Sequence, residues 1–141
     1  SFGSFLWKKN LDNQINIPLF LTGGTFDLVT PAMSEQLGLL LAVSSSPYSR
    51  VLLIEGASHF SPVRVEGQMS KSEGKDLFNL GESIVGYHPL SVQSLLAFEI
   101  TRFLEKLEEK KSIPSNTNLT KGELKFHILD SAKIEKLLII Q

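Results

Sequence analysis

The fold is decided by two apolar runs and the loops after them: residues 17–27, IPLFLTGGTFD, and residues 51–60, VLLIEGASHF. Each run is apolar on both faces, which is typical of a strand buried between helical layers. Each loop contains glycine and a residue suited to acid–base chemistry, Asp27 in the first and His59 in the second. The sequence therefore predicts two buried strands that present Asp27 and His59 just beyond their ends.

The segment between the two runs predicts a helix. Thr30 and Pro31 are typical of a helix start, since Thr can cap the first turn and Pro fits the first helical position. The serine-rich stretch at residues 44–47 should end the helix. The apolar residues expected on its buried face are Met33, Leu37, Leu40 and Leu41. The order strand, helix, strand predicts a parallel pair of strands flanked by helices, an α/β fold.

The second half of the chain predicts one long helix. Apolar residues recur at three- and four-residue steps from Pro89 or Ser91 to about Lys111. The polar passage before it, residues 61–88, either shapes a pocket or is a poorly ordered surface loop. We expect residues 1–111 to form one α/β unit.

The last part of the chain is less regular. Residues 113–122 have the composition of a linker, and Leu124, Phe126 and Ile128 alternate with polar residues in a weak strand pattern. The closing apolar run, residues 137–140, has no clear place in the fold. We therefore assign residues 112–141 to a linker and a tail of uncertain structure.

Composition limits the classes of function. The 141 residues are 42% hydrophobic and 21% charged, as in a folded domain. A net charge of −1 gives no reason to expect nucleic acid as a partner. The absence of cysteine excludes thiol nucleophiles and zinc–thiolate sites, and no apolar run approaches the roughly 20 residues of a transmembrane helix. Nothing in the sequence indicates a compartment.

Each of the two candidate residues has an ordinary explanation when it is taken alone. Asp27 can be a loop carboxylate near a helix start, and His59 can be a packed or surface residue. The two residues together favour a catalytic site more than either does alone, because ligands of α/β sheets bind beyond the carboxyl ends of parallel strands. His88 and His127 have no metal-ligand spacing with His59, so we expect neither a metal nor a cofactor.

The two loops resemble the C-terminal part of the α/β-hydrolase superfamily. Residues 18–31, PLFLTGGTFDLVTP, resemble its acid-bearing strand and loop, and residues 51–60 resemble its last core strand and histidine loop. IEGASHF at residues 54–60 and LGESIVG at residues 80–86 are similar to bacterial dienelactone-hydrolase-like and platelet-activating-factor-acetylhydrolase-like proteins. The resemblance covers about residues 15–107 and implies the C-terminal part of an α/β-hydrolase fold with an incomplete sheet.

The sequence departs from that family in one respect. The nucleophile of the family lies on a Gly-x-Ser-x-Gly turn before the acid and the histidine, and this chain has no such motif. The chain also begins with Ser1 rather than Met, so we expect it to be part of something longer.

The resemblance implies a serine hydrolase for carboxylic esters, with a small-molecule or lipid-like substrate. Asp27 would be the acid and His59 the base of its catalytic triad, and the nucleophile would come from a missing N-terminal half of the fold or from a partner chain. Without a nucleophile, the chain alone should be inactive. The alternatives are a non-catalytic hydrolase-like binding module and one half of a split enzyme.

Overall fold

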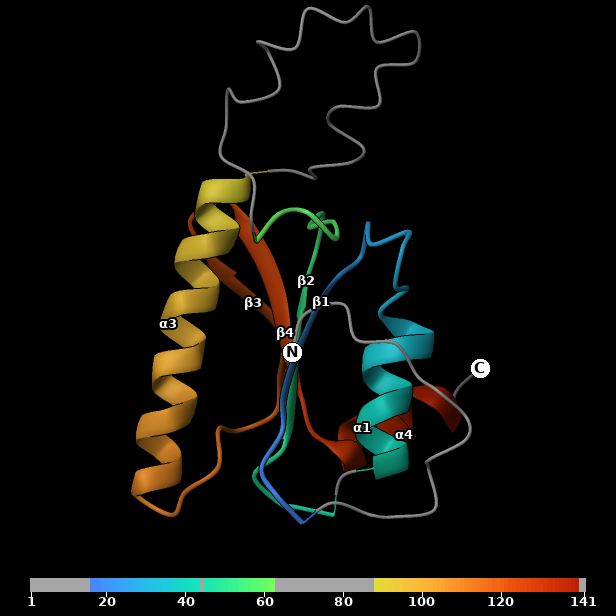
Figure 1. The fold of residues 1–141 in the computed structure, drawn as a ribbon, viewed down its shortest axis with the longest axis vertical. Helices are drawn as coiled ribbons and strands as arrows, with labels where there is room; N and C mark the ends of the chain where they lie inside the picture. The colour runs from blue at the N-terminus through green and yellow to red at the C-terminus, as the bar shows by residue number, and fades with distance from the viewer. Residues whose placement is uncertain (1–15, 44, 63–87, 140–141) are drawn as a thin grey trace, which may run out of the picture.

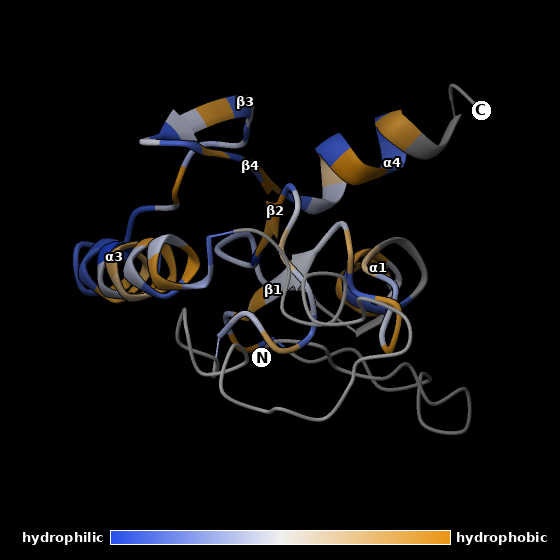
Figure 2. Ribbon diagram, turned by 90° about the horizontal axis from the view of Figure 1, so that it is seen from above, coloured by the Kyte–Doolittle hydropathy of each residue, from blue (hydrophilic) through white to orange (hydrophobic). Residues whose placement is uncertain are grey.

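The computed structural model describes residues 16–43, 45–62 and 88–139, so the predictions for residues 63–87, with the LGESIVG motif, lie outside it. The described residues form a mixed α/β fold with a four-stranded sheet (Figure 1). Seen from above, α3 lies on one side of the sheet and α1 and α4 on the other (Figure 2). The elements are β1 (Phe20–Gly24), η2 (Met33–Leu37), α1 (Gly38–Val43), β2 (Arg50–Ile54), α3 (Pro89–Glu108), β3 (Asn116–Lys121), β4 (Leu124–Leu129) and α4 (Ser131–Ile139).

The two apolar runs form β1 and β2, which pair in parallel as predicted. Phe20 lies opposite Arg50, and Gly24 lies opposite Ile54. Four of the five residues of β2 are buried, because helices cover both faces of the sheet at this point. Since parallel strands end at the same edge, the loops after β1 and β2 lie together there.

The connection between β1 and β2 is helical, but it begins later than the sequence predicts. Its first turn is η2, a π-helical stretch, and the N-cap residue is Ala32, which makes no side-chain cap bond. The prediction that Thr30 caps this helix is wrong, because its hydroxyl donates to Asp27 instead. α1 follows η2 and ends directly before the serine-rich stretch, as predicted. Leu37 and Leu40 are buried in a cluster completed by Leu21, Val51, Leu129 and Ile134.

The predicted long helix is confirmed as α3, which covers the other face of the sheet. Its buried side chains are Pro89, Val92, Leu95, Leu96, Glu99 and Phe103. The apolar members of this face belong to the larger core cluster, in which the sheet contributes Leu52, Ile54, Leu124, Phe126 and Ile128. The sheet provides the second layer that an apolar helix face needs, although Ile100 and Leu104 of the same repeat are 44 and 55% exposed.

The C-terminal residues extend the sheet. β4 lies between β2 and β3 and is antiparallel to both, so the sheet is mixed rather than purely parallel. The weak strand pattern in β4 is confirmed, and the apolar run at the end of the chain begins within α4. The prediction of a linker at residues 113–122 is wrong for Asn116–Lys121, which forms β3. Composition misleads there because β3 is the last strand in the sheet order and is half exposed or exposed throughout.

Arg50 joins the start of β2 to the segment before β3. Its side chain is buried, and its Nε and one terminal nitrogen donate to the backbone carbonyls of Ile113, Pro47 and Ser49, at 2.5, 2.9 and 2.6 Å. Burial lowers the pKa of the Arg50 guanidinium, and the negative charge of Asp130 opposes this shift. The sequence contains no local pattern that would single out this residue.

We expect Arg50→Met to lower the free energy of unfolding by about 3 kcal/mol, because it leaves buried carbonyl groups without their donor. Urea denaturation followed by circular dichroism measures the change. Lys111→Met serves as the control, since Lys111 is exposed and its ion pair with Glu109 lies at the surface. The control should change stability by less than about 0.5 kcal/mol. Equal effects of the two substitutions would contradict a bridging role for Arg50.

Candidate functional site

Two backbone hydrogen bonds and one side-chain hydrogen bond hold the loops after β1 and β2 together. Thr25 donates its N–H to the carbonyl of Ile54 at 3.0 Å, and Phe26 donates to the carbonyl of Ala57 at 2.9 Å. Gly56 donates its N–H to the Thr25 hydroxyl at 2.8 Å. The two loops therefore act as one unit, and the residues that follow on each loop are placed relative to one another.

Gly24 allows the loops to come this close. A Cβ atom on Gly24 would lie 2.0 Å from the carbonyl oxygen of Ala57, a distance that real Cβ atoms do not show. Ala57 itself is fully buried. The glycine is thus required by the close approach of one backbone to another.

The structure brings together the two residues singled out from the sequence. The Nδ1 atom of His59 lies 3.1 Å from Oδ2 of Asp27. The Asp27 side chain is fully buried, whereas 28% of the His59 side chain is exposed. A buried carboxylate bound to a partly exposed imidazole is the arrangement found in the acid–base half of a catalytic triad.

Three further donors hold the Asp27 carboxylate in place. Oδ1 accepts from the backbone N–H groups of Val29 and Thr30, at 3.1 and 2.7 Å, and Oδ2 accepts from the Thr30 hydroxyl at 2.8 Å. The same hydroxyl oxygen lies 3.3 Å from Nδ1 of His59. With His59 included, four donors therefore surround an acceptor-only, ionised carboxylate, which satisfies its charge inside the protein.

Thr30 was missed as a site residue in the sequence. We expected it to cap a helix, but it touches both Asp27 and His59. The signal that could have identified it is an Asp with a hydroxyl residue three positions later in a glycine-containing loop, because such an Asp commonly bonds the backbone just ahead of it.

These contacts determine which nitrogen of His59 carries the proton. An ionised carboxylate only accepts hydrogen bonds, so Nδ1 of His59 is the donor toward Asp27. The neutral ring then has a lone pair on Nε2, and in the described part of the chain Nε2 makes no hydrogen bond. The ring also meets Phe60 edge-on, with 5.3 Å between the ring centroids. His59 is held at one nitrogen and remains a base at the other.

The loop beyond His59 is anchored on α3. Ser58 donates its N–H to the Ser61 hydroxyl at 2.9 Å, and Gln93 of α3 donates to the carbonyl of Ser61 at 3.3 Å. Both serine residues are buried. The hydroxyl that contacts His59 within residues 16–43, 45–62 and 88–139 belongs to Thr30 and lies at Nδ1. These residues therefore place no nucleophile at Nε2.

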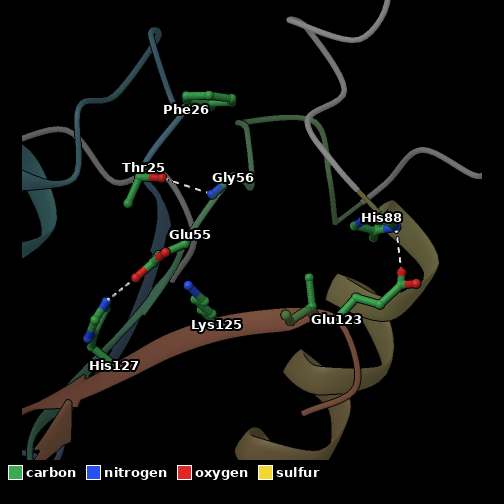
Figure 3. Close-up of a pocket in the computed structure, with 9 residues that line it drawn as sticks. Thr25, Phe26, Glu55, Gly56, His88, Glu123, Lys125 and His127 are labelled. Atoms are coloured by element: carbon green, nitrogen blue, oxygen red, sulfur yellow. Dashed lines mark hydrogen bonds and ion pairs between the residues drawn. The ribbon is translucent and has the colours of Figure 1, made fainter. Parts of the chain in front are cut away.

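A cavity of about 610 Å³ opens at the ends of β1 and β2 (Figure 3). Thr25 and Phe26 line it from one loop, and Glu55 and Gly56 line it from the other. The remaining lining residues are His88, Glu123, Leu124, Lys125 and His127. Two histidine–glutamate pairs lie in its wall, His127 with Glu55 and His88 with Glu123, each at 3.0 Å. His127, which the sequence leaves in an unplaced tail, thus lies beside the loop that leads to His59.

The described residues contain neither a metal-ligand cluster nor a helix that could span a membrane. Within the described ranges, no group of three or more His, Asp or Glu side chains could hold a metal ion. In the same ranges, no helix is long and apolar enough to cross a membrane.

Comparisons with protein-family models, with curated proteins and with solved structures gave no match.

Proposed function

We propose that this chain supplies the acid and the general base of a serine hydrolase for carboxylic esters. One observation carries the proposal: Nδ1 of His59 lies 3.1 Å from the buried carboxylate of Asp27, which assigns the proton to that nitrogen, while Nε2 makes no hydrogen bond with the described residues. This is the protonation pattern that a general base needs, because the base must accept a proton at one nitrogen while the other is held.

The proposed reaction uses Nε2 of His59 twice. It first takes the proton of a serine hydroxyl as the serine oxygen attacks the ester carbonyl carbon, and the imidazole becomes positively charged. It then gives that proton to the departing alkoxide, which leaves as an alcohol. Water repeats both steps to release the acid and free the serine. Asp27 keeps the ring in the correct tautomer and stabilises its charged form throughout.

Apolar side chains near Asp27 support an ester with an apolar acyl or alcohol group. Phe26, Leu28 and Val29 are exposed by 44, 85 and 48% on the loop that carries Asp27. Exposed apolar groups gathered at one site favour contact with an apolar ligand. We therefore propose small-molecule or lipid-like esters as substrates.

The serine must come from outside this sequence in the proposed mechanism, because the chain has no Gly-x-Ser-x-Gly turn. An N-terminal half of the hydrolase fold or a partner chain, as in a split enzyme, would bring the serine to Nε2 of His59. A non-catalytic hydrolase-like binding module would keep the Asp27–His59 contact but would hydrolyse no ester.

The test compares two proteins: this chain alone, and the product of the entire reading frame that encodes it. We expect no hydrolysis of p-nitrophenyl butyrate by the chain alone, because nothing attacks the ester. The longer product should hydrolyse the ester and react with a fluorophosphonate probe, and His59→Ala should abolish both. If the chain alone hydrolyses the ester and His59→Ala removes that activity, the prediction that the chain lacks a nucleophile is wrong. Hydrolysis by the longer product that is unaffected by His59→Ala would refute the proposed function.

A further inference from the structure

The β3–β4 hairpin is tied to the loop of His59 through Glu55, the first residue after β2. Glu55 donates its backbone N–H to the carbonyl of Lys125 at 2.9 Å. Its side-chain Oε1 lies 3.0 Å from Nε2 of His127 (Figure 3). His127 pairs with Leu53 of β2, so its contact with Glu55 is a diagonal contact between neighbouring strands. The start of the histidine loop is therefore held by both its backbone and a side chain.

The second contact of His127 favours one tautomer of its ring. The backbone N–H of Asn118 in β3 donates to Nδ1 of His127 at 3.1 Å. Because a backbone N–H can only donate, this nitrogen must be an acceptor without a proton. Nε2 then carries the proton and donates it to the carboxylate of Glu55. Both ring nitrogens of His127 are engaged, and 18% of its side chain is exposed.

A β-bulge in β3 makes the second contact possible. The register between β3 and β4 shifts between Asn116 and Leu119, and Asn118 within this bulge has a φ of 59°. Asn tolerates this left-handed conformation better than most residues, and a bulge re-aims the groups near it. The Asn118 N–H therefore meets a side chain, His127, rather than a backbone carbonyl of the ladder.

The loop after Glu55 is then held from both sides. On one side Glu55 is bonded to β4, and on the other Gly56 and Ala57 are bonded to Thr25 and Phe26 on the Asp27 loop. His59 follows two residues beyond Ala57. His59 is thus four residues from Glu55, so a change at Glu55 is transmitted along this short loop to the imidazole that faces Asp27.

We propose that His127 is a positioning residue, which acts through Glu55 to hold the loop of His59 in register with Asp27. The catalytic meaning of this role rests on the proposed function, but the coupling itself is a property of the described residues. The β3–β4 hairpin thereby contributes to the acid–base pair without touching it. Loss of the Glu55–His127 bond frees one anchor of the loop and increases local opening around His59.

The experiment follows the Nδ1 proton of His59 by nitrogen-edited NMR in the chain itself. His127→Gln keeps a donor close to the position of Nε2, so it can still bond Glu55. His127→Asn keeps an acceptor close to the position of Nδ1 but is too short to reach Glu55. We expect solvent exchange of the His59 proton to be about tenfold faster in His127→Asn than in the wild type, as for the loss of a hydrogen bond to a charged group, and near wild type in His127→Gln.

His88→Gln is the matched control, because it changes the other histidine–glutamate pair of the same cavity, which involves Glu123 and not Glu55. It should leave the His59 proton unchanged. If His127→Asn speeds exchange no more than His88→Gln does, the positioning role is overturned. Glu55→Ala removes the same bond from a side chain that is 43% exposed, so it gives the same test if His127→Asn fails to fold.

The two proposals can fail separately in this experiment. Asp27→Asn should remove the exchange-protected Nδ1 proton of His59, because its acceptor is lost. If that proton persists unchanged in Asp27→Asn, the proposed acid–base pair is wrong. If Asp27→Asn removes it but His127→Asn and Glu55→Ala leave it unchanged, the positioning role alone is wrong.

Discussion

Asp27→Asn is expected to lower kcat for ester hydrolysis by about 10⁴-fold in the proposed enzyme, in which the serine is supplied from outside this sequence, the size of the effect known for the corresponding change in serine hydrolases. An amide has nearly the shape of the carboxylate, so the contacts from Val29 and Thr30 can remain. The amide has no negative charge, and its NH₂ group can donate to His59 and thereby favour the wrong tautomer. KM should change little, since the substrate does not contact Asp27 in the proposed mechanism.

Asp130→Asn is the matched control for this prediction. Asp130 bonds the backbone N–H of Lys133 at the start of α4, near the end of β2 remote from the histidine loop. Asparagine caps a helix about as well as aspartate, and Asp130 is remote from the Asp27–His59 contact, so kcat should stay near wild type. A loss of kcat below about tenfold in Asp27→Asn would show that His59 does not depend on Asp27, because a general base contributes more than that to the rate.

Gly24→Ala is expected to destabilise the protein by at least about 3 kcal/mol, because the new methyl group meets backbone atoms that have no room to move away. The clash is with the carbonyl oxygen and carbon of Ala57, at 2.0 and 2.4 Å from the added Cβ atom. Relief requires the two loops to separate, which breaks the hydrogen bond from Phe26 to Ala57. Asp27 and His59 would move apart with them.

The adjacent Gly23 provides the control. A Cβ atom there would lie 3.0 Å from the side-chain oxygen of Gln36, which can turn away, and 3.1 Å from the Ala32 methyl group, which can move only with its backbone. Both distances are about 1 Å longer than the shortest contact at Gly24. We expect Gly23→Ala to cost about 1 kcal/mol, against at least three times that for Gly24→Ala. Thermal and urea unfolding of both variants measures the difference. A Gly24→Ala protein as stable as Gly23→Ala would contradict the close approach of the loops.

The central part of the fold could be predicted because the local sequence patterns agree with the way in which the strands and helices pack. The two apolar runs needed helical layers on both faces, and the serine-rich stretch gave the connection a clear end. The same agreement held for α3, whose repeat and proline start are local features. The contact between Asp27 and His59 could be anticipated for the same reason, since each lies on the loop that follows its strand.

The remaining features depend on contacts between distant residues. β3 contains no apolar alternation because it needs none at the edge of the sheet, and its pairing is set by β4. Thr30 was misread because a threonine before proline fits a helix cap equally well, and only the position of Asp27 decides between the two uses. Neither the role of Arg50 nor the contact between His127 and Glu55 has a local pattern in the sequence.

The antiparallel insertion of β4 also governs when the protein can complete its fold during synthesis. Glu55 and His127 are 72 residues apart in the chain, so a ribosome that has just made α3 has released Asp27 and His59 but not the strand that flanks β2. Until β4 emerges, that side of β2 is open to pairing with strands of other nascent chains. Closing the sheet and securing the histidine loop are thus one late event, since the same hairpin accomplishes both.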